Sequence, residues 1–330
     1  MRKLNIILQS LYFLSLIFIF SCRESIIDNS NDFELTAIPD GLNIFRAHDG
    51  VIGLEWNYFL EQNRKGFNIY RSENDTLNFQ KIDFTTEPFY YDDSLEYDTT
   101  YFYKLTSVNK QNVESNFSNY VSAKPVNLYP PLTPHLLNIF AQNWETGRKI
   151  ILTWANNYDS DIDHYEIYRT EIQGSVNLSN LIGTSRTTIF EDTLNLKLLT
   201  RYYYQIKAVD KGNLKSGFSR SVTDILLDAP EPLSPINESI DSSMFNFKFI
   251  TSGAPATYKI FIQNNQYVDI VDQVTVSSTA IHDTLTVPFG TTYLIPNKKY
   301  YWRIAAYSST LNYANVFSGF NSFQYSPGLK

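Results

Sequence analysis

The chain repeats one sequence pattern, and this repetition constrains its fold more than any other feature. Leu54-Glu-Trp56 is followed by Gly66-Phe-Asn-Ile-Tyr-Arg71, and further along Leu152-Thr-Trp154 is followed by His164-Tyr-Glu-Ile-Tyr-Arg169 at the same internal spacing. A third, more divergent copy begins at Phe245-Asn-Phe247, where Phe stands in place of Trp. Repetition on this scale indicates a series of similar units.

A second recurring motif shows which secondary structure builds these units. Tyr101-Phe-Tyr-Lys-Leu-Thr-Ser-Val108 corresponds to Tyr202-Tyr-Tyr-Gln-Ile-Lys-Ala-Val209 and to Tyr300-Tyr-Trp-Arg-Ile-Ala-Ala306. Alternate residues of such a segment fall on opposite faces, which is the period of a β-strand, and no stretch after residue 22 sustains the helical period. The sequence therefore predicts an all-β protein.

The three copies resemble fibronectin type III domains. That family carries Leu-x-Trp on its B strand, Gly-Tyr-x-Ile-Tyr-Arg on its C strand and a corner tyrosine at the start of its F strand. The resemblance covers about residues 39–328 and implies three tandem immunoglobulin-like β-sandwiches. We expect these sandwiches at 39–126, 127–228 and, in divergent form, 229–330.

Two positions in each copy should be structural. Trp56 and Trp154 occupy the same B-strand position, so we expect them at the centre of their cores. The resemblance implies that Tyr101, Tyr202 and Tyr300 are corner tyrosines, whose hydroxyl groups cap nearby backbone. Proline-rich boundaries at 124–131 and 228–232 predict stiff linkers and a semi-rigid rod.

The N-terminus has the pattern of a targeting segment. Arg2 and Lys3 precede the apolar run Leu11–Phe20, as in a secretory signal peptide. The alternative of a retained membrane anchor is less favoured, because the apolar segment is short for a bilayer and no basic cluster follows it.

Ile19-Phe20-Ser21-Cys22 resembles the lipobox of a bacterial lipoprotein, although Phe20 departs from the usual small residue. This resemblance implies cleavage of a signal peptide at 1–21 and lipidation of Cys22, the chain's only cysteine. Polar residues 22–38 then form a flexible, lipidated tether. The expected location is the bacterial cell envelope, most simply its outer membrane, with the membrane contacted through the lipid on Cys22.

Composition narrows the possible functions. With 27 basic and 34 acidic side chains the net charge is −7, so nucleic acid is not an expected partner. One cysteine and four histidines leave no material for a disulfide framework or a multi-Cys zinc site. No cofactor, no metal and no catalytic residues are predicted, and we expect a protein that is not an enzyme.

Asp159-Ser-Asp161-Ile-Asp163 is the densest group of carboxylates. It has the spacing of the start of a calcium loop, but it lacks the glycine at the sixth position and the distal Glu of such loops. A polar turn before the C strand is the favoured interpretation over metal binding.

Tyrosine and phenylalanine are abundant, with 24 and 23 residues, and strand alternation predicts that some of them face outward. The candidate exposed contact residues, one on the C strand and one on the F strand of each copy, are Tyr70 and Phe102, Tyr168 and Tyr203, and Phe261 and Tyr301. They are either cross-strand pairs that only stabilise the sheet, or three patches that bind a polymer or a neighbouring subunit multivalently.

Two functions from different classes agree with these features. The first is a non-catalytic cell-envelope lipoprotein that acts as a surface interaction or scaffold module. The alternative is a carbohydrate-binding accessory lipoprotein of a surface uptake system, whose exposed aromatic rings stack on sugars. The sequence leaves open whether the partner is a protein or a glycan.

Overall fold

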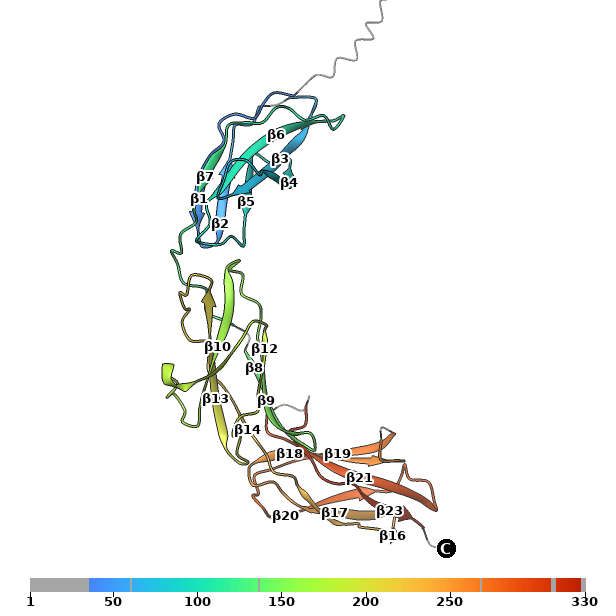
Figure 1. Cartoon of the computed structure of the whole chain (residues 1–330). Coiled ribbons are helices and arrows are strands. Elements are labelled where there is room, and N and C mark those ends of the chain that lie inside the picture. The colour runs from blue at the N-terminus through green and yellow to red at the C-terminus, as the bar shows by residue number, and fades with distance from the viewer. Residues whose placement is uncertain (1–35, 60, 136, 268, 310–312, 328–330) are drawn as a thin grey trace, which may run out of the picture.

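The computed structural model describes residues 36–59, 61–135, 137–267, 269–309 and 313–327. Regular structure in these segments is β apart from one 3-10 turn, η1 (Leu178–Asn180). Three β-sandwiches follow one another along a curved chain (Figure 1), so the predicted all-β fold of three tandem fibronectin type III-like sandwiches is confirmed. The predicted signal peptide at 1–21 and Cys22 lie outside the described residues.

The first sandwich packs a three-stranded sheet, ordered β1-β2-β5, against a four-stranded sheet, ordered β4-β3-β6-β7. Its strands are β1 (Asn43–His48), β2 (Val51–Glu55), β3 (Arg64–Glu73), β4 (Gln80–Thr85), β5 (Phe89–Asp92), β6 (Tyr101–Asn109) and β7 (Val121–Ala123). Both inner faces are apolar because alternate strand residues point inward, and Ile52, Leu54, Ile69 and Leu105 are fully buried between them.

The tether predicted at 22–38 does not extend to residue 38. Thr36 is buried and its hydroxyl group contacts that of Ser107 on β6, while the Ser107 hydroxyl donates to the Ala37 carbonyl oxygen at 2.5 Å. These bonds fasten residues 36–37 to the first sandwich, because a buried polar strand residue needs partners that the polar N-terminal segment provides.

The second sandwich pairs the sheet β11-β10-β13-β14 with the strands β12, β9 and β8. Its strands are β8 (Asn138–Trp144), β9 (Gly147–Thr153), β10 (Ile162–Thr170), β11 (Leu181–Ser185), β12 (Ile189–Asp192), β13 (Arg201–Asp210) and β14 (Val222–Ile225). Ile150, Leu152, Ile167 and Ile206 are fully buried in its core.

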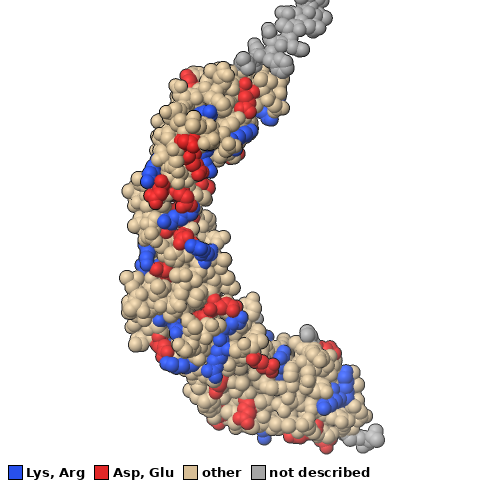
Figure 2. All heavy atoms as spheres, in the orientation of Figure 1, with Lys and Arg blue, Asp and Glu red and all other residues tan. Residues whose placement is uncertain are grey.

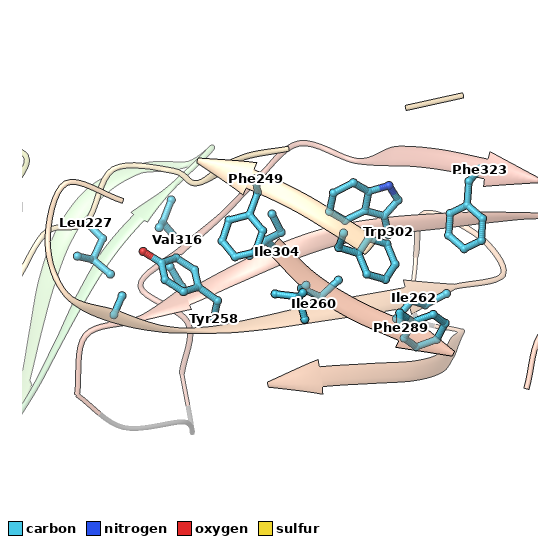
Figure 3. Packing of buried hydrophobic residues seen from close by; sticks show 14 of the residues in the cluster. Leu227, Phe249, Tyr258, Ile260, Ile262, Phe289, Trp302, Ile304, Val316 and Phe323 are labelled. Atoms are coloured by element: carbon cyan, nitrogen blue, oxygen red, sulfur yellow. The ribbon is translucent and has the colours of Figure 1, made fainter. Parts of the chain in front are cut away.

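The third sandwich has the sheet β15-β17-β20 on one side and β22-β21-β18-β19 with β23 and β16 on the other. Its strands are β15 (Glu231–Ser234), β16 (Glu238–Ile240), β17 (Met244–Ile250), β18 (Ala256–Gln263), β19 (Ile270–Ser278), β20 (Thr284–Gly290), β21 (Lys298–Tyr307), β22 (Val316–Phe317) and β23 (Asn321–Tyr325). Its core is the most aromatic of the three, with Phe249, Tyr258, Phe289 and Trp302 packed between the sheets (Figure 3).

The two repeated tryptophans are core residues, as predicted. Trp56 and Trp154 are each 6% exposed, and their rings pack edge-on against Phe67 and Tyr165 at centroid distances of 5.2 and 5.1 Å. In the third copy Phe247 takes this position. The indole comes instead from β21, the F strand of this copy, where Trp302 packs on Phe247 at a centroid distance of 4.7 Å. The divergent copy has therefore moved its tryptophan across the core.

The corner tyrosines are also confirmed in all three copies. The hydroxyl oxygens of Tyr101, Tyr202 and Tyr300 accept the backbone N–H groups of residues 96, 197 and 295 at 3.0, 2.9 and 2.7 Å. Each tyrosine is almost fully buried, so its hydroxyl group needs such a partner.

A buried polar network joins the two sheets of the first and second sandwiches. In the first, Asp92 accepts from Arg71 at 3.1 and 3.0 Å and from the Tyr103 hydroxyl at 2.6 Å. Arg169, Asp192 and Tyr204 repeat it in the second, with both bonds to Asp192 at 2.7 Å. Burial and the adjacent carboxylate raise the pKa of both tyrosines, so their hydroxyl groups remain donors at neutral pH.

The third sandwich fills the same positions with apolar side chains. Ile262 stands where Arg71 and Arg169 stand, and Trp302 stands where Tyr103 and Tyr204 stand. Both are fully buried. Apolar packing thus replaces the charged network, which is energetically neutral or favourable when the volume is matched.

We predict that Asp192→Ala destabilises the second sandwich by about 1 to 3 kcal/mol, because it leaves the buried Tyr204 hydroxyl group without its acceptor, whereas the partly exposed Arg169 keeps its bond to the Leu194 carbonyl oxygen. Glu191→Ala is the matched control: it removes the neighbouring carboxylate, which forms an exposed 2.8 Å ion pair with Lys149 and contributes about 1 kcal/mol or less. Urea unfolding of the full chain measures both. Equal effects of the two substitutions would show that the network is not structural.

The second proline-rich boundary, predicted at 228–232 as a stiff linker, is joined to both neighbouring cores by the residues around it. Leu226 and Leu227 are fully buried in the cores of the second and third sandwiches respectively, and Pro232 already lies in β15. The chain thus passes directly from one core into the next. The expected semi-rigid rod is in fact an arch, since the third sandwich turns away from the axis of the first two (Figure 1).

Candidate interaction surface

The C strands of the three copies are β3, β10 and β18, and the F strands are β6, β13 and β21. The outer faces of the sheets that contain them carry the six aromatic residues predicted as contacts. In each copy the β-sheet register places the C-strand aromatic opposite a polar residue of the F strand, Lys104, Gln205 or Arg303. The two aromatics of a copy are therefore diagonal neighbours, two residues apart in register, and not directly opposed pairs.

Tyr168 is not exposed, contrary to the prediction. Only 1% of its surface is accessible, because the Phe218 ring packs edge-on against it at 5.0 Å and its hydroxyl group donates to Glu166 at 2.5 Å. Lys215 binds the other oxygen of Glu166 at 2.6 Å. Strand parity places this tyrosine on the outer face, but the segment after the F strand folds back and covers it.

The other five predicted residues are half-buried, and several have partners within the chain. Tyr70 packs on Phe117 at 4.9 Å and donates to Glu114 at 2.8 Å. Phe102 lies edge-on to the exposed Tyr120 at 5.8 Å. Their rings are thus largely occupied by neighbours within the first sandwich.

In the remaining copies Tyr203 lies opposite Thr170 of β10 and Thr223 of β14. Tyr301 has the Lys299 ammonium group 5.2 Å from its ring centre. Phe261 belongs to a small apolar cluster on the outer face, discussed below. We conclude that the three copies do not present three equivalent aromatic patches.

In every copy a phenylalanine that was not predicted from the sequence lies on this outer face, next to the aromatic residue of the C strand. Phe117, Phe218 and Phe317 each precede a serine, Ser118, Ser219 or Ser318, and that serine hydroxyl accepts a backbone N–H group of the F strand at 2.9 to 3.0 Å. A cation covers each ring: Lys104 at 3.7 Å, Lys207 at 4.4 Å and Arg303 at 4.4 Å. The repeated Phe-Ser dipeptide was the signal in the sequence.

The most exposed aromatic rings lie in loops. Tyr158 and Tyr267 are 87% and 81% exposed, and neither is on a strand. Alternation applies only to residues on strands, so it does not mark these two positions.

In the third sandwich the outer face is a docking surface within the chain itself. Trp144 at the end of β8 contacts Phe317 at 5.9 Å, and its indole N–H donates to the Ala314 carbonyl oxygen at 3.0 Å. Phe140 of β8 packs on Tyr313 at 5.0 Å. Phe261 joins Phe317 in the apolar cluster that this contact extends.

The backbone continues the same contact. The Asn143 N–H group donates to the Asn315 carbonyl oxygen at 2.7 Å, and β8 and β22 run parallel at this point. Strands of the second and third sandwiches therefore belong to one nine-stranded sheet. The two sandwiches share backbone hydrogen bonds as well as side-chain contacts.

Asp224 is the polar centre of this junction. Only 1% of its surface is exposed, and it accepts from the Ala141 N–H group at 2.8 Å, from the Asn315 amide at 3.4 Å and from the Ser308 hydroxyl. Burial raises the pKa of Asp224 above its ordinary value, although these donors act in the opposite direction. One carboxylate thus joins β8 of the second sandwich to two segments of the third.

The junction between the first and second sandwiches is polar. Asp49, in the tight turn between β1 and β2, accepts the backbone N–H groups of Leu128 and Tyr129 at 2.8 and 2.9 Å. Lys211 reaches across to Glu96 at 2.6 Å, and the Tyr97 hydroxyl donates to Asp161. Charges of both signs are mixed along the visible face of the arch (Figure 2).

The acidic sequence Asp159 to Asp163 is a turn that leads into β10, and its first part lies at this junction. Asp159 accepts the Leu132 N–H group at 3.0 Å, Asp161 accepts from Tyr97, and Asp163 accepts from Arg186 at 3.3 Å. Each carboxylate has its own partner. Over the part of the chain that the structure describes, no group of three or more His, Cys, Asp or Glu side chains is arranged to hold a metal ion.

We predict that Asp49→Asn weakens the first junction by about 1 kcal/mol at pH 7. Burial acts to raise the pKa of Asp49, but the bonds from Tyr129, His48 and Leu128 outweigh it and lower the pKa below 3.8. The stabilisation is therefore present above pH 3.8 and is lost as the pH falls through the folded-state pKa. Urea unfolding across this pH range should show wild type and variant converging in acid.

Asp98→Asn is the control for that experiment, since the Asp98 side chain is fully exposed. It should not alter stability measurably at any pH. A pH-independent difference between Asp49→Asn and wild type would contradict the assigned role of the carboxylate charge.

We also predict that Trp144→Ala loosens the second junction. It removes the indole from Phe317 and the hydrogen bond to Ala314, so amide exchange at Asn143 should accelerate by about tenfold or more while the first sandwich is unchanged. Hydrogen exchange with mass spectrometry on the full chain measures this. Tyr158→Ala, at an exposed loop ring, is the control that should leave the exchange of β8 unaltered.

Comparisons with known proteins add little to this description. No family model matches the sequence, and no curated protein matches it. Among solved structures, the FN1-FN3 domains of chicken CNTN1 match over 88% of this chain and 98% of that chain, with a TM-score of 0.39 and 13% sequence identity. The fold assignment therefore rests on the strand order, the paired sheets and the three cores of this chain.

Proposed function

We propose that the protein is a non-catalytic, lipid-anchored cell-envelope protein that acts as an interaction or scaffold module. The observation that supports it best is the second junction, where a shared sheet and buried Asp224 fix two sandwiches relative to each other. Rigid junctions hold loops and strand edges at set distances from an anchor, which suits a protein that presents surfaces to partners.

The anchor is the part of the proposal that comes from the sequence. Cys22 is the only cysteine and follows the apolar run after one residue, Ser21, and Thr36 is packed against the first sandwich. In the segments that the structure describes, no helix is long and apolar enough to cross a bilayer.

Metabolic labelling with an alkyne fatty acid tests the anchor. Wild type should take up the label and fractionate with membranes, and Cys22→Ala should lose both properties, because the lipid would have no attachment site. Thr275→Lys, at an exposed position of β19, is a control that should be labelled as wild type is. Membrane retention of Cys22→Ala would refute lipid anchoring.

Crosslinking in intact cells followed by pull-down tests the scaffold role. Wild type should recover specific protein partners, and Trp144→Ala should recover fewer of them, since it loosens the junction that orients the third sandwich. Recovery of glycans without proteins, supported by glycan-array binding, would favour the carbohydrate-binding alternative. Equal recovery by wild type and Trp144→Ala would show that the fixed arch is not needed for binding.

A further inference from the structure

Strand β19 (Ile270–Ser278) is an open edge of the nine-stranded sheet. It pairs with β18 on one side, and among the described residues no strand pairs with its other side. The backbone groups of alternate residues therefore point away from the sheet. Along Asp272–Ser278 the outward-facing side chains are Gln273, Thr275 and Ser277, which are exposed, neutral and short enough for close approach.

Nine residues make β19 longer than every other edge strand in the described segments. The comparable edges carry features that discourage strand pairing. In the first sandwich β4 has six residues, two of them charged (Lys81 and Asp83), and in the third β20 contains Pro288. By contrast β19 contains neither Pro nor Gly nor any basic residue, and its one charge is Asp272.

The equivalent edge of the second sandwich shows the same contrast. β11 has only five residues, Leu181–Ser185, including Gly183. The edge strands β4, β11 and β19 all share a register shift, which in β19 falls at Val271 and leaves Asp272–Ser278 regular. Edge strands that are long, regular and uncharged are templates for pairing with another chain. In the described residues β19 is the longest edge strand, and its stretch Asp272–Ser278 is regular and carries one charge, at its end.

We propose that β19 pairs with β19 of a second copy of this chain, antiparallel about a two-fold axis at Thr275. In this register Thr275 faces Thr275, Val274 faces Val276, and Gln273 faces Ser277. Threonine pairs and pairs of β-branched residues are favourable cross-strand neighbours. Two nine-stranded sheets would then join into one.

The charge on the strand supports a second copy as the occupant. In the proposed register Asp272 faces Ser278, which can donate a hydrogen bond to it, and the two Asp272 carboxylates lie on opposite sides of the axis. A chain with a net charge of −7 can therefore pair with itself along this strand without opposing like charges. A two-fold interface of this kind is isologous, so it closes at the dimer.

This inference names one partner within the proposed interaction role and rests on it, but it does not depend on the lipid or on any other partner. Photo-crosslinking in intact cells tests it, with p-benzoylphenylalanine placed in the full chain at Gln273. We expect a crosslinked band at twice the mass of the monomer on the same gel. The same probe at Thr184, exposed on β11, is the matched control and should give no such band.

A charge variant tests the register. Thr275→Lys places two ammonium groups against each other at the two-fold axis and should reduce the doubled band about tenfold or more, whereas Thr184→Lys should leave it unchanged. Circular dichroism melting confirms that both variants fold. No doubled band from position 273, a band that Thr275→Lys leaves intact, or a crosslink to a different protein would each overturn self-pairing, and the pull-down of other partners would still stand as a test of the scaffold role.

Discussion

The carboxylate of Asp224 and the nearby backbone hydrogen bond from Asn143 to Asn315 hold the second and third sandwiches together. They join β8 of the second sandwich to the segments around Ser308 and Asn315 of the third, and this joining sets the direction in which the third sandwich points. The covering of Phe317 by Trp144 follows from the same contact. The position of the open edge β19, at the end of the nine-stranded sheet, also depends on it.

The three sandwiches fill equivalent positions between their two sheets in two different ways. In the first two, an arginine of the C strand, an aspartate and a tyrosine of the F strand are buried together and satisfy one another. In the third, Ile262 and Trp302 occupy the strand positions of the arginine and the tyrosine. A buried charged network requires all its members, so the first two copies tolerate change at these positions less than the third does.

The sequence was sufficient to predict the fold and the structural residues within each repeat. Alternation identified the strands, and the repeated positions of Trp56, Trp154 and the corner tyrosines identified core and cap residues, because both signals are local. Alternation also placed Tyr168 on the correct face. It could not show that Phe218, from a segment beyond the F strand, would cover that ring.

The contacts at the two junctions could not be predicted from repeats and alternation. Asp224, Asn143 and Asn315 are isolated polar residues in the sequence, and their meaning comes from contacts between segments up to 174 residues apart. The docked end of the tether, at Thr36 and Ala37, is of the same kind. Repeats indicate that sandwiches exist, but the angle between them depends on surface residues that no periodic pattern marks.

The two junctions also differ in what they permit during the evolution of such a chain. An additional sandwich inserted between the first and second repeats would break mainly polar contacts, whose groups water can satisfy. An insertion between the second and third would uncover Tyr313, Ala314 and Phe317, which Phe140 and Trp144 now contact, and would expose an apolar surface. The last two repeats are therefore expected to be inherited, duplicated or lost as one block, whereas the first is free to move as a module.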